Sequence, residues 1–135
     1  MKNISEYAHV SNSAFKIIRR LIPGPYTFVL PATKMKQLPK ILVSKRKTVG
    51  IRVPASRITL ALVKEVGHPI LSTSVTTEEG ELLSDPELIA QRFRNIVDVI
   101  IDAGILTSEP STVIDLTGDR PEIVRKGAGD VSMFE

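Results

Sequence analysis

The stretch PGPYTFVL, residues 23–30, decides the fold because it ends one predicted helix and begins a predicted strand. In residues 15–22, apolar side chains recur at helical spacing, and Ser11 or Ser13 can cap this helix at its amino end. The Pro-Gly-Pro tripeptide ends the helix, since proline in a helix interior removes a backbone hydrogen bond. The β-rich run that follows predicts a strand over residues 26–30.

Strands and helices continue to alternate along the rest of the chain. Further strands are predicted at 48–53, 70–75, 97–101, 112–116 and 123–125, and further helical segments at 38–43, 58–66 and 86–93. In the first of these strands, Val49, Ile51 and Val53 share one face, and Arg52 lies on the other. The alternation of strands and helices along the chain favours an α/β sheet. The two final strands follow one another directly and argue against a purely parallel sheet.

Composition is typical of an ordinary globular domain. The chain has 135 residues, of which 42% are hydrophobic and 24% are charged, and we expect a single domain over residues 1–135. The absence of cysteine excludes a disulfide scaffold and makes the cytoplasm the expected compartment. No apolar run reaches the roughly 20 residues of a membrane-spanning helix, so no membrane association is expected.

Charge is distributed unevenly along the chain. Residues 1–66 carry 13 Lys and Arg against 2 Asp and Glu, whereas residues 67–135 carry 5 against 13. The basic cluster consists of Arg19, Arg20, Lys34, Lys36, Lys40, Lys45, Arg46 and Lys47. Such a cluster indicates either a solvated surface or contact with nucleotide or RNA phosphates. No aromatic residues interleave with it, which argues against a platform for stacking RNA bases.

Hydroxyls and arginines at strand ends are the remaining candidates for chemistry. The chain lacks the glycine-rich phosphate loops and the common hydrolase motifs, and its two histidines, His9 and His68, have no metal-ligand spacing. The run at 72–74, Ser-Thr-Ser, closes one predicted strand, while Arg52 and Arg125 lie near the ends of two others. Ligands of open α/β sheets bind at strand ends, where hydroxyls and arginines hold phosphate. The alternative is that the hydroxyls of residues 72–74 satisfy loose backbone groups.

Five short motifs occur in order along the chain: PGPYTFVL at 23–30, KTVGIRVP at 47–54, HPILSTS at 68–74, PSTVID at 110–115 and IVRKG at 123–127. Together they resemble the YrdC-like family, and within it the YciO branch most of all. Five ordered motifs are far more specific than any one of them, and they span most of the chain. The resemblance implies a twisted, open, mixed α/β sheet with flanking helices and a basic concave surface.

The resemblance also implies a function and a set of site residues. Family members include the enzyme that makes threonylcarbamoyl-AMP from threonine, bicarbonate and ATP with release of pyrophosphate, for threonylcarbamoyladenosine modification of tRNA. The implied nucleotide-binding residues are Ser72, Thr73, Ser74, Ser111 and Arg125, and the implied cavity wall consists of Thr27 and Arg52. ATP with magnesium is expected as a substrate, with no tightly bound cofactor and no dedicated metal site in the protein.

The chain departs from the family pattern in two places. Catalytic members continue the Ser-Thr-Ser run into Ala-Asn, where this chain has Val75-Thr76. The family domain also begins with a strand, a helix and a Lys-x-Arg segment that precede the position of Ser5. We therefore expect a domain that is incomplete at its amino end, weakly active or inactive alone, and prone to form dimers. A non-catalytic module that binds double-stranded RNA or tRNA stays open as the alternative to a nucleotidyltransferase-type enzyme.

Overall fold

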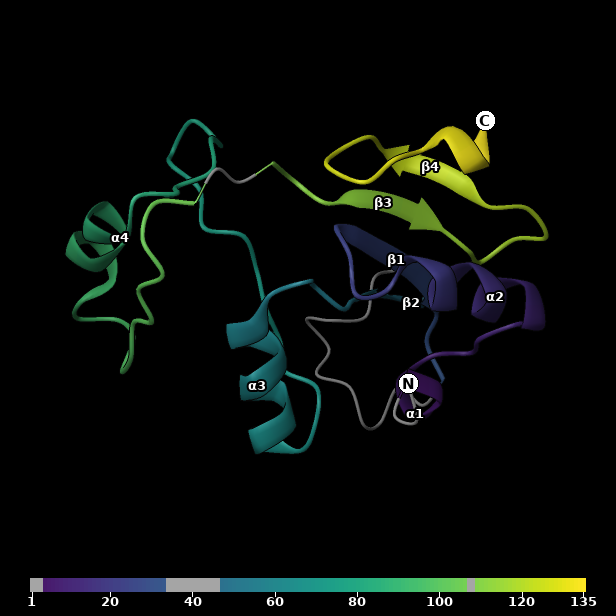
Figure 1. Ribbon diagram of the computed structural model, residues 1–135, viewed down its shortest axis with the longest axis horizontal. Helices are drawn as coiled ribbons and strands as arrows, with labels where there is room; N and C mark the ends of the chain where they lie inside the picture. The colour runs from purple at the N-terminus through teal and green to yellow at the C-terminus, as the bar shows by residue number, and fades with distance from the viewer. Residues whose placement is uncertain (1–3, 34–46, 107–108) are drawn as a thin grey trace. The chain divides into compact units, whose positions relative to one another are not determined.

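The computed structural model describes residues 4–33, 47–106 and 109–135 (Figure 1). Its chain forms two compact units, one made of Met1–Ile70 with Pro110–Glu135 and the other of Leu71–Glu109. The first unit holds the sheet, and each unit is described by itself. The expectation of one incomplete domain over residues 1–135 stays a prediction.

The first unit is built on a mixed, open sheet of four strands. The strands are β1 (Tyr26–Pro31), β2 (Thr48–Arg52), β3 (Thr112–Asp115) and β4 (Glu122–Arg125). They lie in the order β2-β1-β3-β4 (Figure 1). The central strands β1 and β3 are parallel, whereas β2 and β4 pair antiparallel with their inner neighbours. The predicted mixed sheet with helices is confirmed, including the antiparallel pairing of the two final strands.

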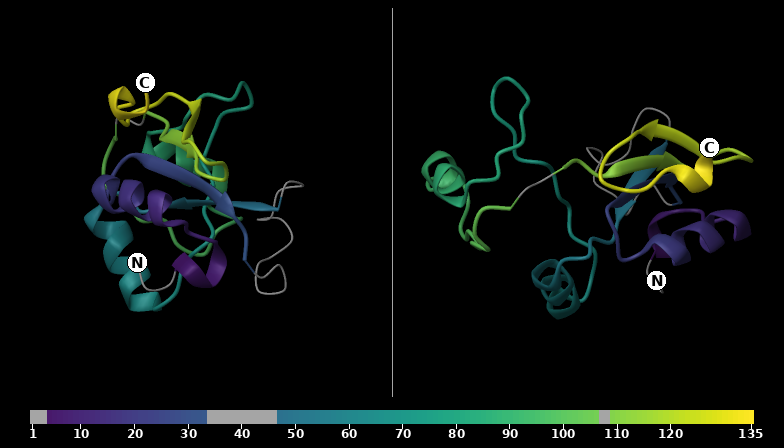
Figure 2. Two further views of the ribbon diagram at one scale, coloured as in Figure 1. Left: turned by 90° about the vertical axis from the view of Figure 1, so that its right-hand side faces the viewer. Right: turned by 45° about the horizontal axis from the view of Figure 1, so that its top comes forward.

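One face of the sheet packs against the amino-terminal helices and forms the core. These helices are α1 (Ile4–Tyr7) and α2 (Asn12–Leu21), and α2 lies along the sheet (Figure 2). Alternate residues of β1 are buried, as the pleat requires, so Phe28 and Leu30 pack with Ile18 of α2 and Ile114 of β3. The other face carries the intervening residues of each strand, and it is named the second face below.

Local sequence signals set the ends of the predicted helices. Ser11 caps α2 by accepting a hydrogen bond from the backbone of Ala14 at 3.1 Å. The helix α3 (Arg57–Val66) ends at Gly67, which adopts a φ of +80° that glycine tolerates best. In the second unit, the helix α4 (Pro86–Phe93) is capped by Asp85. The predicted helical segment at 38–43 lies outside the described residues.

Two strand predictions are wrong, and both concern the second unit or its border. Residues 70–75 and 97–101 belong to no strand, and the bridge between Thr76 and Leu82 is the β pairing described for the second unit. A β-rich sequence becomes a strand only when a neighbouring segment supplies a ladder of backbone hydrogen bonds. Among the described residues, the Leu83 N–H group donates to the Val75 carbonyl oxygen at 3.0 Å, and no ladder forms along either range. Val97, Val99 and Ile101 are consequently exposed rather than buried, by 41%, 75% and 56%.

Candidate functional site

Two hydroxyls meet where the parallel strands begin. Thr27 is the second residue of β1, and Ser111 directly precedes β3. Their side-chain oxygens lie 2.8 Å apart and share one hydrogen bond, for which either can be the donor. Ser111 is only 6% exposed, so its hydroxyl is held in a partly dry environment. The two residues implied for separate roles, nucleotide contact and cavity wall, therefore form a single pair.

Arg125, at the end of β4, docks its guanidinium group onto Ser111. Nε and Nη2 of Arg125 donate to the Ser111 carbonyl oxygen at 3.2 and 2.8 Å, and Nη2 also approaches the Ser111 hydroxyl at 3.3 Å. Nη1 makes no hydrogen bond within the part of the chain that the structure describes. Arg125 itself is exposed. Its guanidinium group is thus held in one orientation by Ser111, while Nη1 can donate hydrogen bonds to a ligand that arrives from solvent.

The strand register places a second arginine on the same face. Arg52 pairs with Thr27 across β2 and β1, Thr27 pairs with Val113 across β1 and β3, and Val113 pairs with Arg125 across β3 and β4. Paired residues of adjacent strands share a face, so these four residues form one row across the second face of the sheet. Three strand spacings of about 4.8 Å separate the two arginines along this row.

The four residues of this row and Ser111 are together named the cationic row. Its side chains are of the kinds that bind an anion. It offers two guanidinium groups and two hydroxyls, which bind phosphate through charge-assisted hydrogen bonds. It contains no carboxylate, imidazole or thiol for acid-base or nucleophilic catalysis. Among the described residues, no group of three or more His, Cys, Asp or Glu side chains is placed to hold a metal ion.

The Ser72-Thr73-Ser74 run is described with the second unit, by itself. These residues belong to the second unit, and all three are exposed. The Thr73 hydroxyl donates weakly to the carbonyl of Ser74 at 3.5 Å. Within the first unit, the structure brings Thr27, Ser111 and Arg125 together through hydrogen bonds and places Arg52 in the same row of the sheet. The implied nucleotide-binding role of residues 72–74 stays a prediction.

Most of the predicted basic cluster cannot be placed. Its central members, Lys34, Lys36, Lys40, Lys45 and Arg46, lie outside the described residues. Arg19 and Arg20 are exposed in the last turn of α2. Since α2 packs on the core face, these two arginines do not contribute to the cationic row.

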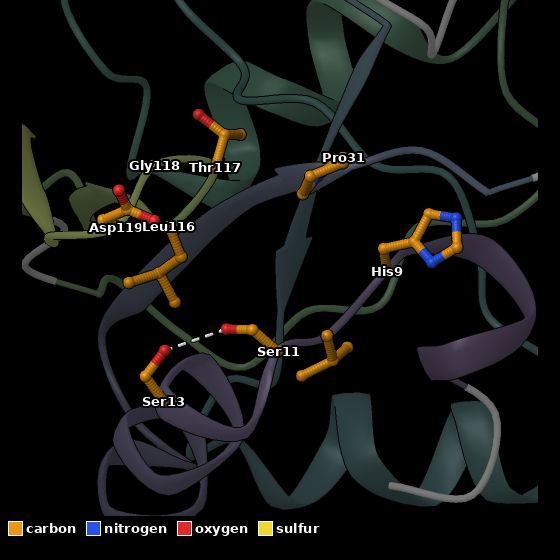
Figure 3. Close-up of a pocket in the computed structure, with 9 residues that line it drawn as sticks. His9, Ser11, Ser13, Pro31, Leu116, Thr117, Gly118 and Asp119 are labelled. Carbon is orange, nitrogen blue, oxygen red and sulfur yellow. Dashed lines mark hydrogen bonds between the residues drawn. The ribbon is translucent and has the colours of Figure 1, made fainter.

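A cavity of about 390 Å³ opens at the other end of the parallel strands (Figure 3). The segment between α1 and α2 and the first turn of α2 line it with His9, Ser11 and Ser13. The turn after β3 lines it with Thr117, Gly118 and Asp119. The two serine hydroxyls bond to each other at 3.0 Å, and Ser11 already caps the helix. The sequence analysis did not single out this cavity, and its hydroxyls have structural partners.

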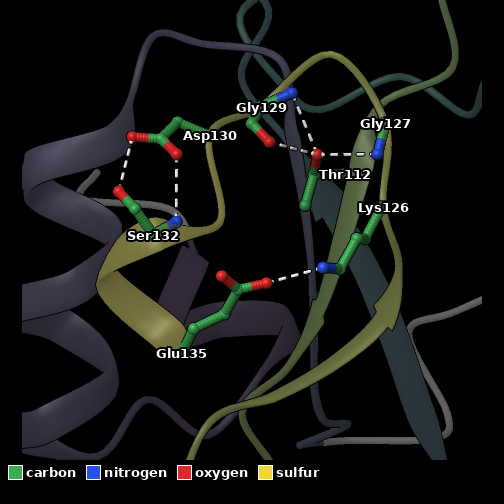
Figure 4. Close-up of polar contacts among 7 residues, drawn as sticks. All are labelled: Thr112, Lys126, Gly127, Gly129, Asp130, Ser132 and Glu135. Atoms are coloured by element: carbon green, nitrogen blue, oxygen red, sulfur yellow. Dashed lines mark hydrogen bonds and ion pairs between the residues drawn. The ribbon is translucent and has the colours of Figure 1, made fainter.

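Sequence reasoning also missed a buried hydroxyl beside Ser111. Thr112 is fully buried, and its Oγ1 atom bonds to the backbone of Gly127 and Gly129 in the segment after β4 (Figure 4). The sequence feature that could have indicated this contact is the pair of glycines at 127 and 129, shortly after Arg125. A buried threonine close to two glycines is recognisable only once the two segments are brought together.

No helix among the described residues has the length and apolar character needed to cross a membrane. The predicted absence of a membrane partner and the cytoplasmic location stay predictions.

Similarity to known proteins extends over nearly the whole chain. The family model for Sua5, YciO and YrdC proteins, described as telomere recombination, matches residues 1–127. The uncharacterized protein YciO of Escherichia coli K12 is 46% identical over 136 residues, which cover 99% of this chain and 65% of YciO. A threonylcarbamoyl-AMP synthase of Pyrococcus abyssi is 32% identical over 119 residues, which cover 87% of this chain and 34% of that protein.

Solved structures show the same relationship. The crystal structure of E. coli YciO matches with a TM-score of 0.90 over 99% of this chain and 65% of that chain, at 46% identity. The structure of P. abyssi Sua5 complexed with L-threonine matches with a TM-score of 0.83 at 29% identity, over 94% of this chain and 37% of that chain. This chain thus spans 65% of the length of YciO. On the family match and these relatives, the chain belongs to the Sua5/YciO/YrdC family.

Proposed function

We propose that the cationic row binds the phosphates of ATP, and that the protein is a nucleotide-binding relative of the threonylcarbamoyl-AMP synthases. The observation that carries the proposal is the docked guanidinium of Arg125, which leaves Nη1 without a partner among the described residues while Nε and Nη2 hold Ser111. Arg52 supplies a second positive charge on the same face. Magnesium enters with ATP as part of the substrate complex and is held by phosphate oxygens and water.

The same geometry defines what the row contributes to adenylate transfer. In that reaction, an oxygen of the threonine-derived carbamate forms a bond to the α-phosphorus of ATP, and the bond to the β-phosphate breaks to release pyrophosphate. Negative charge accumulates on the phosphate oxygens during this step, and preorganised cations stabilise it. Arg52 and Arg125 fill this electrostatic role. Threonine is the co-substrate that we propose, because a Sua5 relative has been solved with L-threonine. Bicarbonate, as the source of the carbamate carbon, and a cytoplasmic location belong to the same proposal.

The test is calorimetric titration of the purified chain with ATP and magnesium, with and without threonine and bicarbonate. The Arg125→Ala variant removes the docked guanidinium, and Arg125→Lys keeps the charge but loses the planar fork. Arg19→Ala is the matched control, since Arg19 is an equally exposed arginine on α2. We expect saturable binding in the wild type and in Arg19→Ala, weaker binding in Arg125→Lys, and no binding in Arg125→Ala.

Release of pyrophosphate is then measured with all three substrates. Binding without release supports a nucleotide site that is inactive in this chain alone. A folded wild-type protein that does not bind ATP overturns the proposal. In that case, binding of double-stranded RNA that weakens steeply with salt and survives Arg125→Ala would identify the protein as an RNA-binding module instead.

A further inference from the structure

The segment that follows β4, residues 126–130, makes three hydrogen bonds to the side chain of Thr112 at the start of β3, and it is named the glycine strap here. The Thr112 hydroxyl donates to the Gly129 carbonyl oxygen at 2.7 Å and accepts from the backbone N–H groups of Gly129 and Gly127 at 2.9 and 3.1 Å (Figure 4). A threonine hydroxyl has one proton and two lone pairs, so all its hydrogen-bonding capacity is used on the strap. The strap therefore depends on a fully buried polar group.

The strap is also in close contact with the sheet along its backbone. Its central residue, Ala128, donates to the Pro110 carbonyl oxygen at 2.9 Å, and the Tyr26 hydroxyl donates to the Asp130 carbonyl oxygen at 3.0 Å. A Cβ atom at position 129 would lie 2.4 Å from the Tyr26 ring. Glycine is thus required there by close approach.

The position of the strap matters because the contacts of the Arg125 guanidinium with Ser111 require the backbone at the end of β4 to stay in place. Arg125 is exposed and is the last residue of a four-residue strand. The pairing of β3 with β4 is irregular between Val113 and Ile114, next to the pair that Val113 forms with Arg125. Short and irregular pairing leaves the end of β4 weakly held. The next segment along the chain, the glycine strap, is bonded to Thr112 and can therefore restrain the end of β4.

We propose that Thr112 is a positioning residue for the site. Its hydroxyl anchors the glycine strap and thereby holds the Arg125 guanidinium over Ser111. The expected effect of Thr112 on ATP binding rests on the proposed function. The positioning of Arg125 by Thr112 does not depend on it. Thr112 is too deeply buried to contact ATP, so its effect on binding passes through Arg125.

The experiment compares Thr112→Val, which keeps the shape and removes the hydroxyl, with Thr112→Ser, which keeps the hydroxyl and removes a methyl group. The direct readout is proton exchange of the Arg125 Nε–H group, followed by nitrogen-15 NMR. The second readout is the dissociation constant for ATP with magnesium. We expect exchange to be about tenfold faster and ATP binding about tenfold weaker in Thr112→Val, with both near the wild-type values in Thr112→Ser.

Each outcome separates the two proposals. Faster Arg125 exchange in Thr112→Val alone, in a protein that binds no ATP, rejects the proposed function and supports the positioning role. Unchanged exchange and binding in Thr112→Val overturn the positioning role, as does an equal loss in both variants, which would indicate packing by the methyl group. Should Thr112→Val not fold, exchange is measured in the wild-type protein at low urea concentrations. The N–H groups of Gly127 and Gly129, which donate to Thr112, should then open together with the Arg125 Nε–H group, and an Arg125 group that opens independently of them overturns the proposal.

Discussion

Replacing Gly127 with alanine is expected to lower the free energy of unfolding of the first unit by about 1.5–4.5 kcal/mol. The added Cβ atom would lie 2.1 Å from the Pro110 carbonyl oxygen and 2.8 Å from the Ser111 carbonyl carbon. Ordinary contact begins at 3.4 Å, so the two backbones must separate by about 1.3 Å. Overpacking of this kind costs about 1–3 kcal/mol. The shift also weakens the hydrogen bond from the Gly127 N–H to Thr112, which is worth about 0.5–1.5 kcal/mol.

Equilibrium unfolding in urea, followed by far-UV circular dichroism, measures this change. The matched control is Gly118→Ala in the turn between β3 and β4, where the added Cβ atom meets only the Arg120 carbonyl oxygen at 3.8 Å. Neither glycine has a positive φ, so backbone strain does not separate the two variants. We expect Gly118→Ala to be neutral or slightly stabilising, by up to about 1 kcal/mol. Free energies of unfolding that agree within about 0.5 kcal/mol for the two variants would refute the close-contact argument.

Two further predictions concern the strap's end and the second unit. The Asp130 carboxylate accepts hydrogen bonds from the backbone N–H and the hydroxyl of Ser132, which hold its pKa below the ordinary value of 3.8. The ionised Asp130 carboxylate therefore adds to the free energy of unfolding above about pH 4, and this contribution is lost as the pH falls through the lowered pKa. A carbon-13 NMR titration of Asp130 with a midpoint at or above pH 3.8 would contradict this prediction. The double variant Val99→Lys with Ile101→Lys is expected to abolish self-association of the chain at micromolar concentration, measured by light scattering, because both side chains are more than half exposed. A wild-type chain that is already monodisperse and monomeric would count against that expectation.

Elements with local signals could be predicted from the sequence, and elements that need a distant partner could not. Ser11, Asp85 and Gly67 fix helix ends through contacts within four residues, so α2, α4 and α3 follow from the sequence. Residues 97–101 have the composition of a buried strand but lack a described neighbour to pair with. Composition records the preference of a segment for strand geometry, while the pairing depends on other parts of the polypeptide.

The candidate site divides in the same way. The family resemblance that the ordered motifs carry singled out Thr27, Arg52, Ser111 and Arg125. The register places Thr27, Arg52 and Arg125 on one face of the sheet, and Ser111 shares a hydrogen bond with Thr27. The role of Thr112 depends on contacts with a segment 15 to 17 residues away, which no local pattern reveals.

The mixed topology is what brings the two chemical types of the cationic row together. Hydroxyls at the start of the parallel strands β1 and β3 lie at one edge of the sheet, and Arg52 and Arg125 end strands that run the opposite way. In a purely parallel sheet, all strands begin at one end of the sheet and finish at the other, and ligands bind at the carboxyl ends of the strands. Antiparallel outer strands instead place arginines from two strand ends beside hydroxyls from two strand starts. The consecutive final strands, which argued against a parallel sheet, therefore also bring Arg125 into the cationic row.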